Sequence, residues 1–154
     1  MSRVLVLTTE PLPLPGCPTT GAGMRAWGLT FGLRSAGIDA QVAFAADSVR
    51  GRDVDPSLVP GVHLFNRNEL GSLIEDVVPD AIVVQHWGLM RWIPEVRVPL
   101  AIDLAGPHLL ERRLWGSRNP AGDLAEKIES LARADHVVCS GAFQRHYFLP
   151  FLFQ

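Results

Sequence analysis

Short apolar runs alternate along this chain with longer stretches in which apolar residues recur at helical spacing. The runs are rich in Val, Ile, Leu and Ala at nearly every position, which is typical of strands covered on both faces. They predict strands at Arg3 to Thr9, Ala40 to Ala46, Ala81 to Trp87, Val98 to Gly106 and Asp135 to Gly141. The tetrapeptide Val62 to Phe65 is a candidate for a further short strand.

The stretch between the first two strands predicts a helix. Met24, Trp27 and Phe31 recur at helical spacing, and Gly37 follows as a helix stop. We therefore expect a helix over Ala22 to Ala36, which completes a strand, helix, strand unit.

Helical spacing returns in two later segments, at Leu70, Leu73, Ile74 and Val77 and at Leu124, Ile128, Leu131 and Ala132. The second of these helices is expected over Leu124 to Arg133, and Ser140 is a candidate N-cap for another that begins near Gly141. This alternation predicts an α/β fold: a Rossmann-like, doubly wound, mostly parallel sheet flanked by helices.

The length and the end of the chain bear on its domain organisation. The 154 residues correspond to one ordinary domain. The sequence ends on FLPFLFQ, an apolar segment of a kind that a finished domain rarely leaves uncovered, so we expect a longer parent protein. Either the chain's own sheet or a second copy in a homodimer is expected to cover Phe148, Leu149, Phe151, Leu152 and Phe153.

Charge and cysteine content narrow the class of protein. The net charge of −2 provides no basic surface for DNA or RNA, so we expect no nucleic-acid partner. Cys17 and Cys139 are too few and too far apart for a disulfide framework or a zinc site, which favours a cytoplasmic location. The longest apolar runs fall well short of the roughly 18 residues of a membrane span.

In a parallel sheet, ligands bind beyond the carboxyl ends of the strands, so the residues after each strand are the candidate site. The first such segment is a proline-rich loop that leads to Gly21-Ala22-Gly23. The spacing fits neither the dinucleotide fingerprint nor the P-loop. Gly21 and Gly23 at a helix start are candidates for holding a phosphate or a hydroxyl-rich ligand, and the alternative is that they only permit the turn.

Two later strand ends carry polar and aromatic residues. His86 and Trp87 are candidates for binding a sugar ring, although a strand-end histidine beside a core tryptophan is an equally good interpretation. Asp103 and His108 are candidates for orienting an acceptor hydroxyl or assisting transfer of its proton. A loop cap and an exposed histidine would explain these two equally well.

The remaining polar residues give weaker signals. Asp47 is best explained by a turn, and the arginines within Glu111 to Arg118 by a solvated helix face, with a phosphate-bearing acceptor as the alternative for the arginines. Cys139 is expected in the core. No metal site is expected, because His63, His136 and His146 lack ligand spacing.

Four segments together resemble the N-terminal domain of GT-B-type retaining glycosyltransferases. They are Arg3 to Ala45, with its strand, loop, glycines, helix and strand; PDAIVVQHW at Pro79 to Trp87; PLAIDLAGPH at Pro99 to His108; and ARADHVVCSGAFQRHYF at Ala132 to Phe148. The chain departs from that family in having Gly21-Ala22-Gly23 where two glycines are usually adjacent.

The resemblance implies that the chain forms the acceptor side of a cleft, where a sugar or glycan acceptor binds. A C-terminal domain, absent from this sequence, would hold a nucleotide-sugar as co-substrate, and no other cofactor is implied. Two alternatives remain from sequence: a free-standing Rossmann-like or flavodoxin-like module that binds a nucleotide or phosphorylated ligand, and a catalytically silent interaction domain.

Overall fold

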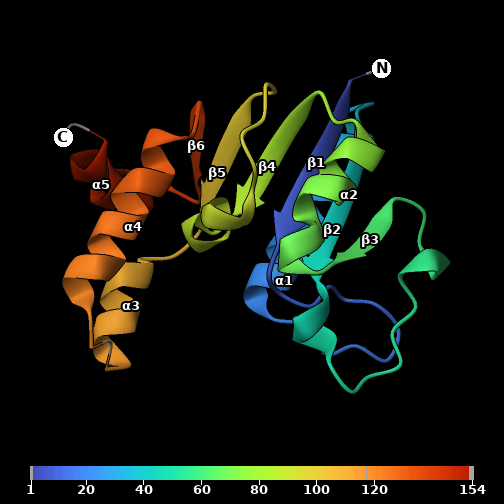
Figure 1. Cartoon of the computed structure of the whole chain (residues 1–154), viewed down its shortest axis with the longest axis horizontal. Helices are drawn as coiled ribbons and strands as arrows, with labels where there is room; N and C mark the ends of the chain where they lie inside the picture. Colours follow the sequence, from blue (N-terminus) through green and yellow to red (C-terminus); the bar gives the residue numbers. More distant parts are fainter. Residues whose placement is uncertain (1, 117, 153–154) are drawn as a thin grey trace.

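The computed structural model describes residues 2–116 and 118–152. Its centre is a six-stranded sheet in the order β3-β2-β1-β4-β5-β6 in which every neighbouring pair is parallel (Figure 1). The strands are β1 (Arg3–Thr8), β2 (Asp39–Ala45), β3 (Val62–Phe65), β4 (Ala81–Gln85), β5 (Leu100–Leu104) and β6 (His136–Cys139). The predicted α/β fold is confirmed, and the short run at Val62 is an edge strand.

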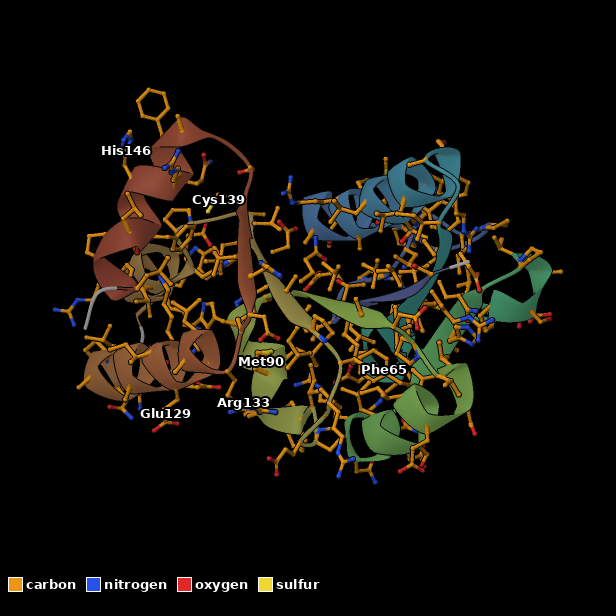
Figure 2. The ribbon with its side chains drawn as sticks, turned by 90° about the horizontal axis from the view of Figure 1, so that it is seen from above. Phe65, Met90, Glu129, Arg133, Cys139 and His146 are labelled. Carbon is orange, nitrogen blue, oxygen red and sulfur yellow. The ribbon has the colours of Figure 1, made fainter. Side chains whose placement is uncertain are left out.

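Five α-helices connect or follow the strands: α1 (Gly21–Ser35), α2 (Leu70–Val77), α3 (His108–Leu114), α4 (Pro120–Ala132) and α5 (Ala142–Phe148). Short 3₁₀ turns lie at η1 (Ala46–Val49), η2 (Pro56–Leu58), η3 (Arg67–Glu69), η4 (Trp87–Trp92) and η5 (Leu149–Phe151). Seen from above, α1 covers one face of the sheet, and α2 and η4 cover the other (Figure 2). Each face therefore has its own apolar core, as a doubly wound sheet requires.

The helix predicted over Ala22 to Ala36 forms as α1, and small residues make up its buried face. Met24 and Phe31 are 51% and 41% exposed, whereas Gly23, Ala26 and Thr30 are buried. These small side chains let the helix lie close to the sheet, and the Thr30 hydroxyl donates to the Ala26 carbonyl at 2.9 Å.

The other helices follow their predictions with two differences. Leu70, Ile74 and Val77 bury the expected face of α2. Helix α4 begins at Pro120, capped by Asn119, and it buries Lys127 rather than Leu124. At the end of α4, the Arg133 guanidinium donates to the Met90 carbonyl at 2.6 Å and so fixes the helix to η4 (Figure 2).

The C-terminal segment turns back onto its own domain. Phe148 is in the core, and Tyr147 and Phe151 pack against that core. Leu152 is 42% exposed, and Phe153 lies outside the described residues. Intramolecular cover is thus found for part of this segment, and the homodimer stays a prediction.

Two local details complete the fold. The residue before α5 that acts as its N-cap is Gly141, whereas the Ser140 hydroxyl donates to the Ala105 carbonyl at 3.3 Å, so the expected serine cap was wrong. None of the helices within the described ranges has the length and apolar character needed to cross a membrane.

The order of the strands determines where a ligand can bind. From β1 the chain moves outward to β2 and β3, then crosses back so that β4 pairs on the other side of β1. The helices on the two sides consequently diverge beyond the carboxyl ends of β1 and β4 and leave a crevice there.

Candidate functional site

A small cavity of about 70 Å³ lies at this switch point. It is lined by Thr9, Glu10, Ala22, Gln85, His86, Asp103, Ala105 and His108. The start of α1 and the ends of β4 and β5 therefore meet as predicted. A cavity of this volume has room for a few water molecules or ligand hydroxyl groups.

Gln85, the last residue of β4, holds three elements together beneath the cavity. Its Oε1 accepts from the Thr8 hydroxyl at 2.6 Å, and its Nε2 donates to the Ala22 carbonyl at 2.7 Å. Gln85 and Thr8 are both buried, so these bonds satisfy groups that would otherwise lack partners. The sequence signal for this residue is an amide at the end of an apolar strand, and it was not singled out.

Asp103 is buried and forms an ion pair with Arg25. Its two carboxylate oxygens accept from Nε and Nη2 of Arg25, both at 2.6 Å, and its side chain is 0% exposed. The hydrogen bonds to this carboxylate raise the pKa of Arg25. With both oxygens engaged, Asp103 is placed to fix α1 on β5 rather than to receive a proton from a ligand.

His86 has a strained backbone and a defined hydrogen bond. Its φ of 89° is rare for a residue with a side chain, and such strain tends to concentrate at functional sites. The ring Nδ1 accepts from the Gly88 N–H at 2.9 Å, so the neutral ring carries its proton on Nε2. Burial, with neighbouring positive charge, lowers the pKa of His86 to about 3. His86 is therefore a neutral hydrogen-bond donor.

Trp87 does not fit the predicted role of a sugar-binding ring. It is 0% exposed, one of the largest buried side chains of the core. Its ring stacks on His86 with centroids 5.1 Å apart, and the Arg112 guanidinium lies 4.7 Å from its centroid. Hydrophobicity drives the indole inward at the start of η4, where it supports His86 and cannot reach a ligand.

His108 opens α3 and lines the cavity. Its ring meets that of His86 edge to face, with centroids 4.4 Å apart. Its Nδ1 is buried without a hydrogen-bond partner in the part of the chain that the structure describes. Burial lowers the pKa of His108, while the nearby Glu111 carboxylate raises it in part. The ring is thus neutral at pH 7, with nitrogen atoms free to exchange a proton.

The two glycines at the start of α1 have different surroundings. A Cβ on Gly23 would lie 2.0 Å from the Pro11 carbonyl oxygen, so Gly23 allows the loop to pack on the helix. The Gly23 N–H already donates to the Thr20 hydroxyl at 3.1 Å. A Cβ on Gly21 would meet no atom within 4 Å, and this residue is exposed. Gly23 is accordingly a packing residue, and only Gly21 is open to a ligand.

Glu10 is a cavity residue that sequence reasoning did not single out. It lies two residues after the end of β1, and its backbone N–H donates to the Thr8 hydroxyl at 3.1 Å. Its Oε2 accepts from the Thr20 hydroxyl at 3.0 Å, which places the carboxylate at the positive end of the α1 dipole. The sequence signal was its position immediately after a buried strand.

The other sequence candidates do not line the cavity. Asp47 pairs with Arg67 at 3.0 Å, and Arg112 pairs with Asp123 at 2.6 Å. Burial raises the pKa of the half-buried Cys139. Within residues 2–116 and 118–152, no group of three or more His, Cys, Asp or Glu side chains is arranged to hold a metal.

No family model and no curated protein matches this sequence. Several solved structures share its fold. An α-glucosyltransferase in complex with UDP superposes with a TM-score of 0.58 at 11% identity, over 98% of this chain and 39% of that one. The α-glucosyltransferase in complex with UDP and a 13-mer DNA containing a central A:G mismatch superposes with a TM-score of 0.56 at 14% identity, over 94% of this chain and 39% of that one. The α-glucosyltransferase in complex with UDP and a 13-mer DNA containing an HMU base superposes with a TM-score of 0.55 at 12% identity, over 90% of this chain and 38% of that one.

These similarities establish the fold and no more, because the identities are low. The chain spans about two fifths of the length of the glucosyltransferases that it matches. The resemblance inferred from sequence is therefore supported at the level of architecture.

Proposed function

We propose that this domain forms the acceptor side of a glycosyltransferase cleft, where a sugar or glycan hydroxyl binds in the cavity at the switch point. A second domain would present the nucleotide-sugar. The observation that carries this proposal is the polar lining of the cavity, in which a carboxylate and neutral imidazoles surround a space of hydroxyl size. The shared fold with UDP-binding glucosyltransferases supports it.

The lining suits a hydroxyl group better than a phosphate. A hydroxyl both donates and accepts, and the cavity offers an acceptor in Glu10 and a donor in the Nε2–H of His86. Among the described residues, no lysine or arginine lines the cavity. The N-terminus of α1, which would attract an anion, already has the Glu10 carboxylate beside it. These features argue against the alternative of a phosphate-binding module.

Within this proposal, His108 takes up the proton of the attacking hydroxyl. The hydroxyl oxygen bonds to the anomeric carbon, the bond from that carbon to the diphosphate breaks, and its electron pair leaves with the nucleoside diphosphate. His86 donates a hydrogen bond through Nε2 and so orients the acceptor. The Arg25–Asp103 pair and Gln85 hold these groups in place. The 154-residue chain alone is expected to transfer no sugar.

The test uses a protein that joins this domain to its donor-binding domain. His108→Ala should reduce turnover by about ten-fold or more, because general base assistance is lost. His146→Ala, on the exposed side of α5, is the matched control and should leave turnover unchanged. Circular dichroism should show both variants folded. Equal turnover in the two variants would contradict the role of His108.

The structural neighbours raise DNA as a competing acceptor, because two of them were solved with DNA. Binding to a duplex depends on neutralising phosphates with basic residues, and this chain carries a net charge of −2. We therefore expect no change in the mobility of a 13-mer duplex at about 50 mM salt, a condition at which phosphate contacts are strong. A shift that disappears as salt is raised would instead favour the DNA acceptor.

A further inference from the structure

We infer that Glu10 determines the specificity of the cavity: its carboxylate binds a neutral hydroxyl and excludes phosphate and carboxylate groups. This inference rests on the proposed function and names the class of acceptor, a neutral polyol, at the same site. An acceptor sugar carries neighbouring hydroxyls, so one can face His108 while the next faces Glu10.

The anchoring of Glu10 leaves one oxygen available. Its backbone N–H donates to the Thr8 hydroxyl and its Oε2 accepts from the Thr20 hydroxyl, so two hydrogen bonds hold Glu10 beside the start of α1. No described residue donates a hydrogen bond to its Oε1. Thr20 in turn caps α1 through the Gly23 N–H. The free oxygen is thus presented from a rigid helix start, the placement that a selective polar contact requires.

Among the residues that line the cavity, Glu10 sets the sign of the net charge. The other carboxylate, Asp103, is neutralised by Arg25. His86 and His108 are neutral because burial lowers the pKa of both rings. The lining then carries one uncompensated negative charge, that of Glu10, which repels an incoming anion and strengthens the hydrogen bond from a hydroxyl.

The experiment follows the ring signals of His86 and His108 by NMR in the 154-residue chain, with two probes. Methyl α-glucoside supplies neutral neighbouring hydroxyls, and inorganic phosphate supplies a small anion. In the unmodified protein, the glucoside should shift these signals and phosphate should not. In Glu10→Gln, affinity for phosphate should rise at least ten-fold. Affinity for the glucoside should fall about five-fold, since hydrogen bonds to charged groups are the stronger ones.

Two further variants make the result specific. Glu75→Gln removes the same charge from the exposed side of α2 and should behave as the unmodified protein. Glu10→Asp keeps the charge and should still exclude phosphate. The amide oxygen of Glu10→Gln can accept the Thr20 hydrogen bond, so thermal unfolding should change little.

The outcomes separate this inference from the proposed function. If the unmodified protein binds the glucoside but Glu10→Gln neither weakens that binding nor admits phosphate, the specificity role is refuted and the acceptor site stands. If the unmodified protein responds to phosphate and not to the glucoside, both the inference and the proposed acceptor role are overturned.

Discussion

Replacing Lys127 with methionine should stabilise this protein, although it removes the only lysine in the sequence. Lys127 lies in α4 and is 0% exposed. Its ammonium has no hydrogen-bond partner among the described residues. It lies over the rings of Tyr147, Phe148 and Phe151, at 5.0, 4.4 and 3.7 Å from their centroids. Methionine keeps most of the apolar stem and removes the buried charge.

The size of the expected stabilisation follows from the balance between the cost of burying the Lys127 charge and the cation–π contacts that offset it. Burial lowers the pKa of Lys127 from its ordinary 10.5 to about 8. At about 1.4 kcal/mol per pH unit, the charged form is less favourable in the fold by roughly 3 kcal/mol. The three rings act on a single ammonium, and together they offset about 0.5–2 kcal/mol of this cost. We therefore expect Lys127→Met to raise the free energy of unfolding by about 1–3 kcal/mol at pH 7.

The destabilisation caused by Lys127 decreases as pH rises. Since the pKa of Lys127 is lower in the folded than in the unfolded protein, the folded state binds fewer protons between pH 8 and 10.5. The penalty is fully present below pH 8 and disappears as pH rises toward 10.5. The raised pKa values of Cys139 and Tyr147 act in the opposite direction. The informative quantity is consequently the difference between the unmodified protein and Lys127→Met.

Urea denaturation at several pH values measures that difference, and it should fall to nearly zero above pH 10.5. Because the chain has a single lysine, ¹³C-lysine labelling gives one side-chain signal whose titration reports the pKa directly. A pKa at or above 10.5, or a methionine variant that is less stable at pH 7, would show that the aromatic rings outweigh the loss of solvation.

Two further predictions concern the packing of α1 and are checked by urea denaturation. Gly23→Ala should destabilise the fold by about 1–3 kcal/mol, because the added Cβ would lie 2.0 Å from the Pro11 carbonyl oxygen. Gly28→Ala, where a Cβ meets no atom within 4 Å, should instead stabilise the helix by about 0.5–1 kcal/mol; similar values for the two variants would contradict the close approach. Arg25→Ala should lower stability by about 3 kcal/mol by leaving Asp103 charged and buried, and the Arg25→Met, Asp103→Leu double variant should recover most of it. A loss below about 1 kcal/mol in Arg25→Ala would show the pair to be weakly coupled.

Sequence patterns alone predicted the parallel sheet and the edge at which its ligand site lies. Strands covered on both faces are apolar at nearly every position, so Arg3 to Thr9 and Ala81 to Trp87 could be recognised without any tertiary information. The rule that ligands bind beyond the carboxyl ends of such strands then indicated His86, Asp103 and His108, and the cavity is lined by all three.

Which of these residues is available to a ligand was decided only by the tertiary structure. Asp103 is occupied by Arg25, a partner 78 positions away, and no local pattern specifies that pairing. Trp87 is buried where α4 packs on η4 and Arg112 of α3 lies over its ring, whereas an aromatic residue after a strand looks the same in sequence whether buried or exposed.

The sequence by itself determined the elements, their order and the end of the sheet where the site lies, because these depend on local periodicity and on the chirality of strand crossovers. The tertiary structure decided the charge and accessibility of the site. It placed Glu10 beside Thr20, paired Asp103 with Arg25, and buried Lys127 with no hydrogen-bond partner for its ammonium among the described residues. Burial and ion pairing are properties of residues brought together from distant parts of the chain, so they follow only from the complete packing.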